Sequence, residues 1–342
     1  MNHPQPVLTI VVPCYNEEEV LGETIKQLSS VLDSLIAEKL ISTESSILFV
    51  DDGSIDRTWR IIAMESARND RVFGLKLARN VGHQKALLAG LETAKNKSDC
   101  VISIDADLQD DVSVIRNFII KYQEGYDIVY GVRQSRKTDT FLKKTTAIGF
   151  YYLMGKLGMH FVPNHADFRL MSRRALEELG RFNECNVFLR GIIPLIGFPS
   201  TKVLYDRKER LAGKTKYPLK KMLSFAFDGI TSFSVAPIRF ITFLGFFLFL
   251  LGGITGSYAL LQKVIGNTNA GWTSLIISIW FIGGLQLMGI GIIGEYIGKI
   301  FTEVKNRPRY TVDIDLYSEI PFKHLQLKKN EMVSPNDVQF KR

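Results

Sequence analysis

Three short stretches rich in carboxylates each follow an apolar run of the kind that forms a buried strand. They are YNEEE after residue 14, DDGSIDRT from Asp51, and DADLQDD, in which Asp105 and Asp107 stand two residues apart. Carboxylates gathered in one place repel each other unless a cation lies among them, and oxygen ligands suit Mg²⁺ or Mn²⁺. A solvated loop often yields one such string. Three of them at three strand ends predict one site for a divalent cation and a diphosphate.

The elements that must position these residues alternate in type along the first 215 residues or so. Apolar runs such as VLTIVVP, SSILFVDD, VFGLKLA and VISIDA indicate buried strands, and helical stretches occur at 17–38 and 56–68. This alternation predicts an α/β domain with a mostly parallel sheet. Ligands of such sheets bind at the carboxyl ends of the strands. We therefore expect the three acidic stretches to meet in one crevice.

Two apolar segments near the C-terminus contain no Asp, Glu, Lys, Arg or His, namely residues 240–262 and 264–294. Each is longer than the roughly 20 residues that a helix needs to cross a bilayer. The sequence therefore predicts two transmembrane helices, at about 237–261 and 272–293. A pair of buried soluble helices is the alternative, but it needs a covering shell for which few residues remain.

The distribution of Lys and Arg around this pair predicts its orientation. Basic residues flank both outer ends, whereas the connecting loop holds only Lys263. The positive-inside rule then places both termini in the cytoplasm of a multi-pass cell-membrane protein. The predicted parts are an α/β domain (1–216), an interfacial region (217–236), two transmembrane helices (237–294) and a cytoplasmic C-terminal tail (295–342).

The interfacial region has apolar residues at helical spacing, with Lys220 and Lys221 on another face. This pattern favours an amphipathic helix lying in the membrane interface, or an ordinary helix packed on the soluble domain. Residues 141–161 allow the same two interpretations.

Charge and cysteine content restrict the partners and the compartment. The formal net charge of the 342-residue chain is +8, and basic runs fall at 133–144, 207–221 and 299–309. Such runs indicate anionic partners. No nucleic-acid module is recognisable, so a membrane surface or a phosphorylated ligand fits better than nucleic acid. Three widely spaced cysteines offer no disulfide framework, which favours a reducing compartment, and the N-terminal stretch lacks the pattern of a signal peptide.

TIVVPCYNEE, FVDDGSIDRT and SIDADLQDD, in this order and spacing, resemble the family 2 glycosyltransferases of GT-A fold. Downstream, DIVYGVRQSR, NHADFRLMSRRALEEL, FLRGIIPLIGF and GEYIGKIFTEVKNRPRY are similar to the polyisoprenyl-phosphate glycosyltransferases, the bactoprenol glucosyltransferase group. The resemblance covers about residues 7–310. It implies a Rossmann-like GT-A catalytic domain, followed by interfacial amphipathic helices and two transmembrane helices.

The resemblance also implies roles for individual residues. Asp105 and Asp107 would hold Mg²⁺ or Mn²⁺ and, with Asp167, form the catalytic set. Asp167 would orient the acceptor or accept a proton, and simple pairing with Arg169 is the alternative. The stretch ARNVGHQKALLAGL resembles the loop and helix start that complete the nucleotide pocket. The expected nucleotide-sugar ligands are Pro13, Tyr15, Asn16, Glu17, Asp51, Asp52, Gly53, Asp105 and Gln109. For Asp51, a structural role at the end of the strand is the alternative.

The acceptor implied by the resemblance is a polyprenyl phosphate. Arginine's fork suits phosphate oxygens, although a surface ion pair is the alternative for each basic residue. A phosphate acceptor is already anionic, so the reaction hardly needs a general base, and catalysis would rest on positioning and on metal stabilisation of the leaving group. The expected acceptor-phosphate ligands are Arg133, Arg169, Arg207, Arg210 and Lys214.

The resemblance, together with the apolar segments, implies a membrane-anchored glycosyltransferase that moves one sugar to undecaprenyl phosphate at the cytoplasmic leaflet. Glucose from UDP-glucose is the leading donor, and inversion at the sugar is implied by the family resemblance alone. Glycines in the second apolar segment predict self-association into a homo-oligomer. The alternatives are a processive polysaccharide synthase of the same family, and a non-catalytic membrane protein that binds nucleotide sugar or assists lipid-carrier translocation. His165, beside the expected centre, is a ligand, an acid–base group or a hydrogen-bonding bystander.

Overall fold

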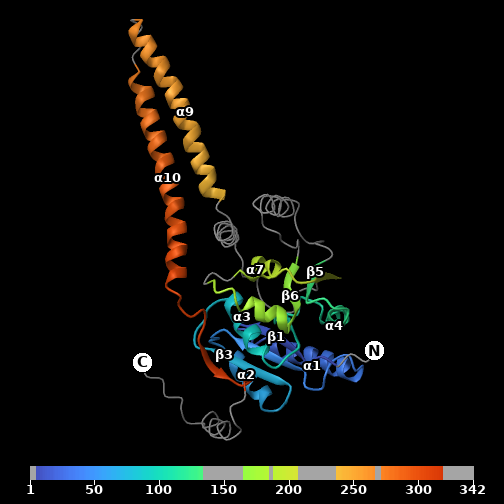
Figure 1. Cartoon of the computed structure of the whole chain (residues 1–342). Coiled ribbons are helices and arrows are strands. Elements are labelled where there is room, and N and C mark those ends of the chain that lie inside the picture. The colour runs from blue at the N-terminus through green and yellow to red at the C-terminus, as the bar shows by residue number, and fades with distance from the viewer. Residues whose placement is uncertain (1–4, 134–164, 185–187, 207–235, 266–270, 319–342) are drawn as a thin grey trace, which may run out of the picture.

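A computed structural model shows an α/β domain from which a long helical hairpin projects (Figure 1). The predictions for 141–161 and for most of 217–236 lie outside the residues that the structure describes. So do those for Arg207, Arg210 and Lys214. The described residues are 5–133, 165–184, 188–206, 236–265 and 271–318.

The described part of the chain forms an eight-stranded sheet with the order β7-β5-β6-β4-β1-β2-β3-β8. β1 is parallel to β2 and β4, β2 is parallel to β3, and β5 is parallel to β7. β6 is antiparallel to β4 and β5, and β8 is antiparallel to β3. The prediction of a mostly parallel α/β sheet is therefore confirmed. The strands are β1 (Leu8–Cys14), β2 (Ser46–Asp51), β3 (Val72–Leu77), β4 (Cys100–Ser103), β5 (Ile128–Arg133), β6 (His165–Ser172), β7 (Ser200–Tyr205) and β8 (Val312–Asp315).

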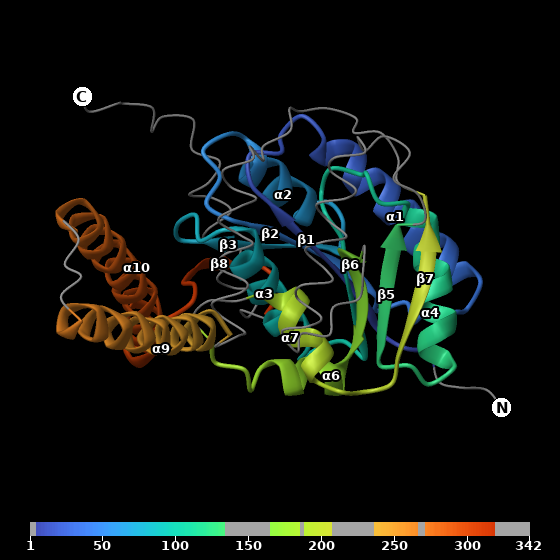
Figure 2. The same cartoon turned by 90° about the horizontal axis from the view of Figure 1, so that it is seen from above.

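Helices cover both faces of the sheet (Figure 2). One apolar cluster joins the sheet to α1, α2 and α4, and a second joins its other face to α3, α6 and α7. Every residue of β1 is buried because the strand is covered on both sides, which is why its sequence is apolar apart from Thr9. The helices are α1 (Leu21–Ala37), α2 (Thr58–Ser66), α3 (His83–Ala94), α4 (Ile115–Gln123), α6 (Arg173–Leu179) and α7 (Leu189–Leu195).

α3 lies unusually close to the sheet because of a glycine. A Cβ added at Gly90 would lie 2.4 Å from Cγ1 of Val11 and 2.7 Å from Cγ2 of Val50. Any larger residue would push the helix away from β1 and β2. This contact fixes the height of α3, and with it the position of the first residues of the helix, above the carboxyl ends of these strands.

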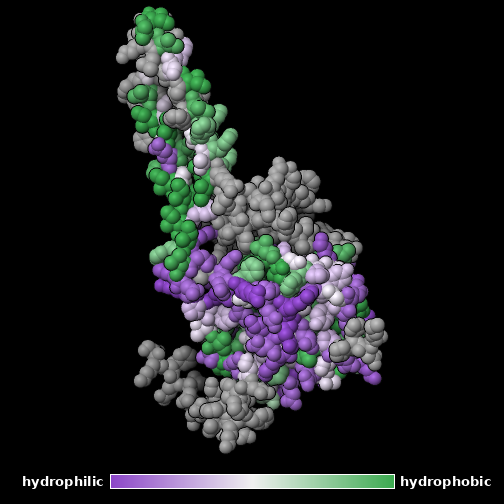
Figure 3. Space-filling model, viewed as in Figure 1, coloured by the Kyte–Doolittle hydropathy of each residue, from purple (hydrophilic) through white to green (hydrophobic). Residues whose placement is uncertain are grey.

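The two apolar segments form the helices α9 (Ala236–Val264) and α10 (Trp272–Val304), as predicted. They run side by side away from the α/β domain, and many of their described side chains are apolar and exposed (Figures 1 and 3). Among the described residues, the stretch Phe281–Val304 of α10 has the length and hydropathy to cross a membrane. The existence of both helices is confirmed, and their crossing of a bilayer as two spans remains a prediction.

The structure differs from the predicted boundary at residue 294. α10 continues to Val304, so Glu295, Lys299 and Glu303 belong to the same helix and do not begin a tail. After α10 the chain returns to the α/β domain, where β8 adds a strand beside β3. Part of the predicted tail is therefore a component of the sheet.

Candidate active site

The loops that follow β1 and β2 are joined to each other by hydrogen bonds. The backbone N–H of Asn16 donates to Oγ of Ser54 at 3.0 Å, and the backbone N–H of Ile55 donates to Oδ1 of Asn16 at 2.9 Å. The backbone N–H of Glu17 donates to Oγ1 of Thr58 at 2.9 Å. Asn16 has a φ of 53°, a left-handed conformation that asparagine adopts more readily than most residues. Two of the predicted nucleotide ligands thus shape the loop pair.

Asp52 and Gly53 attach this loop pair to the chain that enters α3. Asp52 is buried, and its carboxylate accepts the backbone N–H groups of Val81 at 2.7 Å and of Gly82 at 2.9 Å. Burial raises the pKa of Asp52, and the two hydrogen bonds oppose that shift. Gly53 has a φ of 65°, and a Cβ there would lie 2.7 Å from the backbone carbonyl carbon of Arg79. Only glycine fits this position without strain.

The other predicted nucleotide ligands at these strand ends differ in exposure. Asp51 is fully buried; its Oδ1 accepts the backbone N–H of Ser54 at 3.3 Å, its Oδ2 has no hydrogen-bond partner, and burial raises its pKa. Pro13 lies in β1 opposite Val50 of β2. Tyr15 is 39% exposed. The structure brings these residues to one edge of the sheet, and their contact with a nucleotide remains a prediction.

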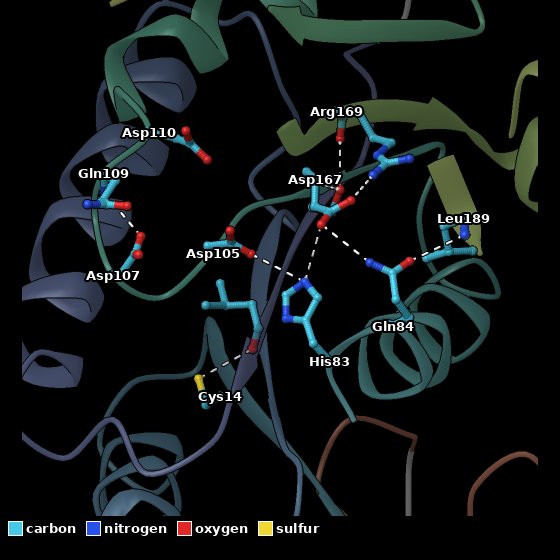
Figure 4. A network of polar contacts seen from close by, with 12 residues as sticks. Cys14, His83, Gln84, Asp105, Asp107, Gln109, Asp110, Asp167, Arg169 and Leu189 are labelled. Carbon is cyan, nitrogen blue, oxygen red and sulfur yellow. Dashed lines mark hydrogen bonds and ion pairs between the residues drawn. The ribbon is translucent and has the colours of Figure 1, made fainter. Parts of the chain in front are cut away.

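Asp105 and Asp107 lie in the loop that follows β4 (Figure 4). Oδ1 of Asp107 accepts the backbone N–H of Gln109 at 3.2 Å, and Leu108 between them has a φ of 54°. Oδ1 of Asp105 is buried and has no hydrogen-bond partner. Burial raises the pKa of Asp105 to about 6; the charge of His83 opposes this shift, and the charges of nearby carboxylates add to it. The cationic group beside Oδ1 of Asp105 is the imidazole of His83, at 3.5 Å, so the carboxylate lies in a setting that favours a cation.

No group of three or more His, Cys, Asp or Glu side chains arranged to hold a metal ion occurs in the part of the chain that the structure describes. Magnesium usually binds through one or two carboxylates, with substrate phosphates and water as the other ligands. Asp105 and Asp107 fit that mode. They do not form a closed protein site.

His83, the first residue of α3, lies between two carboxylates (Figure 4). Its Nε2 is 3.5 Å from Oδ1 of Asp105 and 3.6 Å from Oδ2 of Asp167. Burial lowers the pKa of His83, but the hydrogen bond to Asp167 and the charges of both carboxylates outweigh this and raise it to about 9. The imidazole is therefore protonated near neutral pH. It links the predicted metal ligand to the predicted catalytic carboxylate.

Asp167 in β6 is the buried centre of an ionic network that also contains the buried Arg169 and the partly exposed His83 and Arg190. Nε and Nη2 of Arg190 donate to Oδ1 and Oδ2 of Asp167 at 3.2 and 3.0 Å, and Nη2 of Arg169 also donates to Oδ1. Nε2 of Gln84 donates to Oδ2 at 3.4 Å. Burial raises the pKa of Asp167, but Arg190, His83 and Arg169 together hold it well below its usual range. Such a carboxylate is a poor proton acceptor near neutral pH, so the structure favours the pairing interpretation of Asp167.

Gln84 and Arg190 connect the beginnings of two helices over Asp167. Oε1 of Gln84 accepts the backbone N–H of Leu189 at 3.3 Å, at the start of α7. His83, Gln84 and Arg190 lie in stretches that resemble family motifs, but they were not among the predicted site residues. The only available signal was their presence in motifs of the family resemblance.

The two predicted acceptor-phosphate ligands within the described residues are both bonded to carboxylates. Nε and Nη2 of Arg133 donate to Oδ1 of the buried Asp110 at 3.3 and 3.0 Å, and Tyr205 donates to the same oxygen. Arg169 is 1% exposed, and its Nε and Nη1 have no hydrogen-bond partner. In this structure Arg133 and Arg169 therefore form ion pairs with carboxylates, and their binding of a phosphate remains a prediction. His165 begins β6 opposite Val132.

Residues 9–180, which contain most of this site, match the sequence profile of glycosyl transferase family 2. The chain belongs to glycosyl transferase family 2. The glycosyltransferase YkoT of Bacillus subtilis (strain 168) is 73% identical over 319 residues, which are 93% of this chain and 95% of YkoT. The SfII prophage-derived bactoprenol glucosyl transferase of Shigella flexneri is 40% identical over 307 residues, which are 89% of this chain and 97% of that protein. Family 2 membership and the likeness to a bactoprenol glucosyl transferase agree with the predicted resemblance.

Among solved structures, glucosyl-3-phosphoglycerate synthase from Mycobacterium tuberculosis in complex with Mn²⁺, UDP and phosphoglyceric acid matches 66% of this chain and 76% of that chain. The sequence identity is 17% and the TM-score is 0.43. A likeness this distant carries no inference about the chemistry of the family 2 chain described here.

Proposed function

We propose that the protein transfers one sugar from a nucleoside diphosphate sugar to a polyprenyl phosphate, with UDP-glucose as donor, undecaprenyl phosphate as acceptor and inversion at the sugar. The observation that carries this proposal is the meeting of the Asp105–Asp107 loop with a cationic network at the carboxyl edge of the sheet. The 40% identity to a bactoprenol glucosyl transferase over nearly the whole chain supports the choice of acceptor.

Asp105 and Asp107 are the residues that would hold Mg²⁺ or Mn²⁺. When bound, such an ion supplies charge stabilisation for the departing nucleoside diphosphate. The chain's own part is to hold the two carboxylates in place. The backbone N–H of Gln109 holds Asp107 by a hydrogen bond, and His83 holds Asp105 by an ion pair.

The donor would bind along the joined loops after β1 and β2. Hydrogen bonds from backbone N–H groups to side-chain oxygens fix the loop pair around Asn16, Asp52 and Gly53 without a ligand, so little ordering would be needed on binding. Its carboxylate and amide oxygens suit the hydroxyl and base N–H donors of a nucleotide.

The acceptor phosphate would bind beside the ionic network of Asp167. His83, Arg169 and Arg190 surround this one carboxylate, so the network has an excess of positive charge next to Asp105. Cationic side chains favour a phosphate there. The low pKa of Asp167 agrees with a reaction in which the nucleophile is already anionic and no base is required. The catalytic contribution of the chain is then positioning.

The hairpin of α9 and α10 would anchor this site at the cytoplasmic face of the cell membrane, with two spans and both termini in the cytoplasm. Phe281–Val304 supports membrane anchoring, and the exposed apolar side chains of both helices agree with it. Self-association through the glycines of α10 is part of the same proposal.

Product identification tests the proposal. Membranes that contain the full-length protein are incubated with undecaprenyl phosphate, Mg²⁺ or Mn²⁺, and a panel of labelled nucleotide sugars. We expect one lipid product that carries a single sugar, formed from UDP-glucose. A sugar polymer would instead indicate the processive synthase, and the lack of any lipid-linked sugar would contradict the proposed function.

A further inference from the structure

The segment that follows α10, residues 309–317, is bound to the α/β domain at several points, and we call it the strap. Nη2 of Arg309 donates to Oε1 of Glu92 in α3 at 2.9 Å, and its Nη1 donates to the carbonyl oxygen of Phe182 at 2.9 Å. The hydroxyl of Tyr310 donates to Oε2 of Glu92. The side chains of Arg309 and Glu92 are only 17% and 21% exposed. Glu92 therefore receives two donors from the strap in a largely water-excluded position.

Beyond Tyr310 the strap follows the edge of the sheet, and β8 lies beside β3 (Figure 1). The backbone N–H of Ala78 donates to the carbonyl oxygen of Thr311 at 2.9 Å, and the backbone N–H of Leu316 donates to the carbonyl oxygen of Gly74 at 2.9 Å. Tyr317 is buried, and its hydroxyl is 2.9 Å from Oγ1 of Thr9 in the central strand. The strap is therefore an integral part of the domain.

The strap follows the membrane-compatible stretch in the chain and contacts the helix whose first residue belongs to the candidate site. Arg309 stands five residues beyond Val304, the last residue of that stretch. Ala78 immediately precedes the loop whose N–H groups bind Asp52, and α3 carries Glu92 and His83 on one rigid helix. Hydrogen-bonded groups thus connect Arg309, which follows α10 after a linker of four residues, to the helix and the loop that form part of the site.

We propose that the strap holds the catalytic domain at a fixed height and angle relative to α10, with Glu92 as a positioning residue for transfer to an acceptor in the membrane. This inference rests on the proposed function. The phosphate of a lipid acceptor is confined to the membrane surface, so a domain that swings on a short linker seldom presents its site to that phosphate. An acceptor in solution approaches from any direction and does not need the fixed angle.

The experiment compares two acceptors for the full-length protein in vesicles of phosphatidylethanolamine and phosphatidylglycerol. One acceptor is undecaprenyl phosphate in the vesicles, and the other is citronellyl phosphate, a short prenyl phosphate, in solution. For Glu92→Ala and Arg309→Ala we expect transfer to the vesicle acceptor to fall about 10-fold, a typical size for such coupling. Transfer to citronellyl phosphate stays within about twofold of wild type. Glu124→Ala, which removes the exposed ion pair with Lys121, is the matched control and leaves both rates unchanged.

Equal losses with both acceptors would overturn the inference, because Glu92 would then only stabilise the fold. Unchanged rates with both acceptors would overturn it as well. A wild-type protein that uses neither acceptor would instead refute the proposed function.

A readout without activity keeps the strap testable in that case. A dye is placed at Arg68→Cys in a Cys185→Ser background, since Cys14 and Cys100 are buried. Energy transfer from this dye to labelled lipid headgroups reports the height and angle of the α/β domain relative to the membrane surface. We expect a narrow distribution of transfer efficiencies for wild type and a broad one for Glu92→Ala. Equal widths would overturn the inference.

Discussion

Asp167→Asn is the change whose effect follows most directly from the ionic network. Asp167 and Arg169 are both buried, and the amide keeps the shape of the side chain while it removes the negative charge. Arg169 would then be a buried cation without its partner, and removing one member of a buried pair costs about 3 to 5 kcal/mol of unfolding free energy. For a domain of this size, the midpoint of thermal unfolding should fall by roughly 6 to 20 °C.

The assay is thermal unfolding of the full-length protein in detergent, followed by the fluorescence of Trp59, with Trp272 and Trp280 of α10 replaced by Phe. Asp33→Asn is the matched control, because Asp33 pairs with Arg71 at an exposed position where an ion pair contributes about 1 kcal/mol or less. If Asp167→Asn lowers the midpoint no more than Asp33→Asn does, the network is not the stabilising unit that its geometry indicates.

Three further predictions concern the site. The pKa of His83 is raised to about 9 in the folded protein, above its value of about 6.5 in the unfolded chain. The protonated imidazole therefore stabilises the fold fully below about pH 6.5, and this stabilisation is lost as the pH rises through 9. Between these two pH values, the thermal midpoint of wild type should fall more than that of His83→Gln. Gly53→Ala should lower stability by about 1 to 3 kcal/mol and weaken UDP binding measured by calorimetry, whereas Gly22→Ala, with open space around its Cα, should do neither. Arg190→Gln should raise the acceptor KM about 10-fold or more, whereas Arg181→Gln at an exposed position should leave it unchanged; equal KM values would remove Arg190 from the acceptor site.

Much of the sheet could be predicted from the sequence because its central strands are buried on both faces. β1, β2 and β4 are largely apolar and are followed by polar residues, and their parallel pairing brings the three acidic stretches to the same edge of the sheet. The antiparallel strands gave no such signal. β6 contains the buried ionic residues Asp167 and Arg169, and β8, with the sequence VDID, is a partly exposed edge strand. Charged residues in a strand conceal the apolar pattern on which prediction depends.

The partners of the site residues could not be read from the sequence for a different reason. His83 and Asp167 are 84 positions apart, and only the placement of α3 over the sheet brings them together. The oxygens of Asp52, a predicted nucleotide ligand, accept the backbone N–H groups of Val81 and Gly82, and no residue type reveals these bonds. Residue types in the sequence therefore predicted the kind of site. The contacts that each carboxylate of the site makes depend on the fold.

The central claim is that the Asp105–Asp107 loop supports transfer of one sugar to a lipid phosphate. Its most direct test is mass spectrometry of the lipid product formed by wild type, Asp107→Asn and Asp111→Asn from UDP-glucose and undecaprenyl phosphate. Asp111 lies in the same loop but caps the short 3₁₀ turn at Val112–Val114. We predict undecaprenyl phosphate with one added hexose for wild type and Asp111→Asn, and a rate lower by at least about 100-fold for Asp107→Asn. Product formed at the wild-type rate by Asp107→Asn would contradict the account.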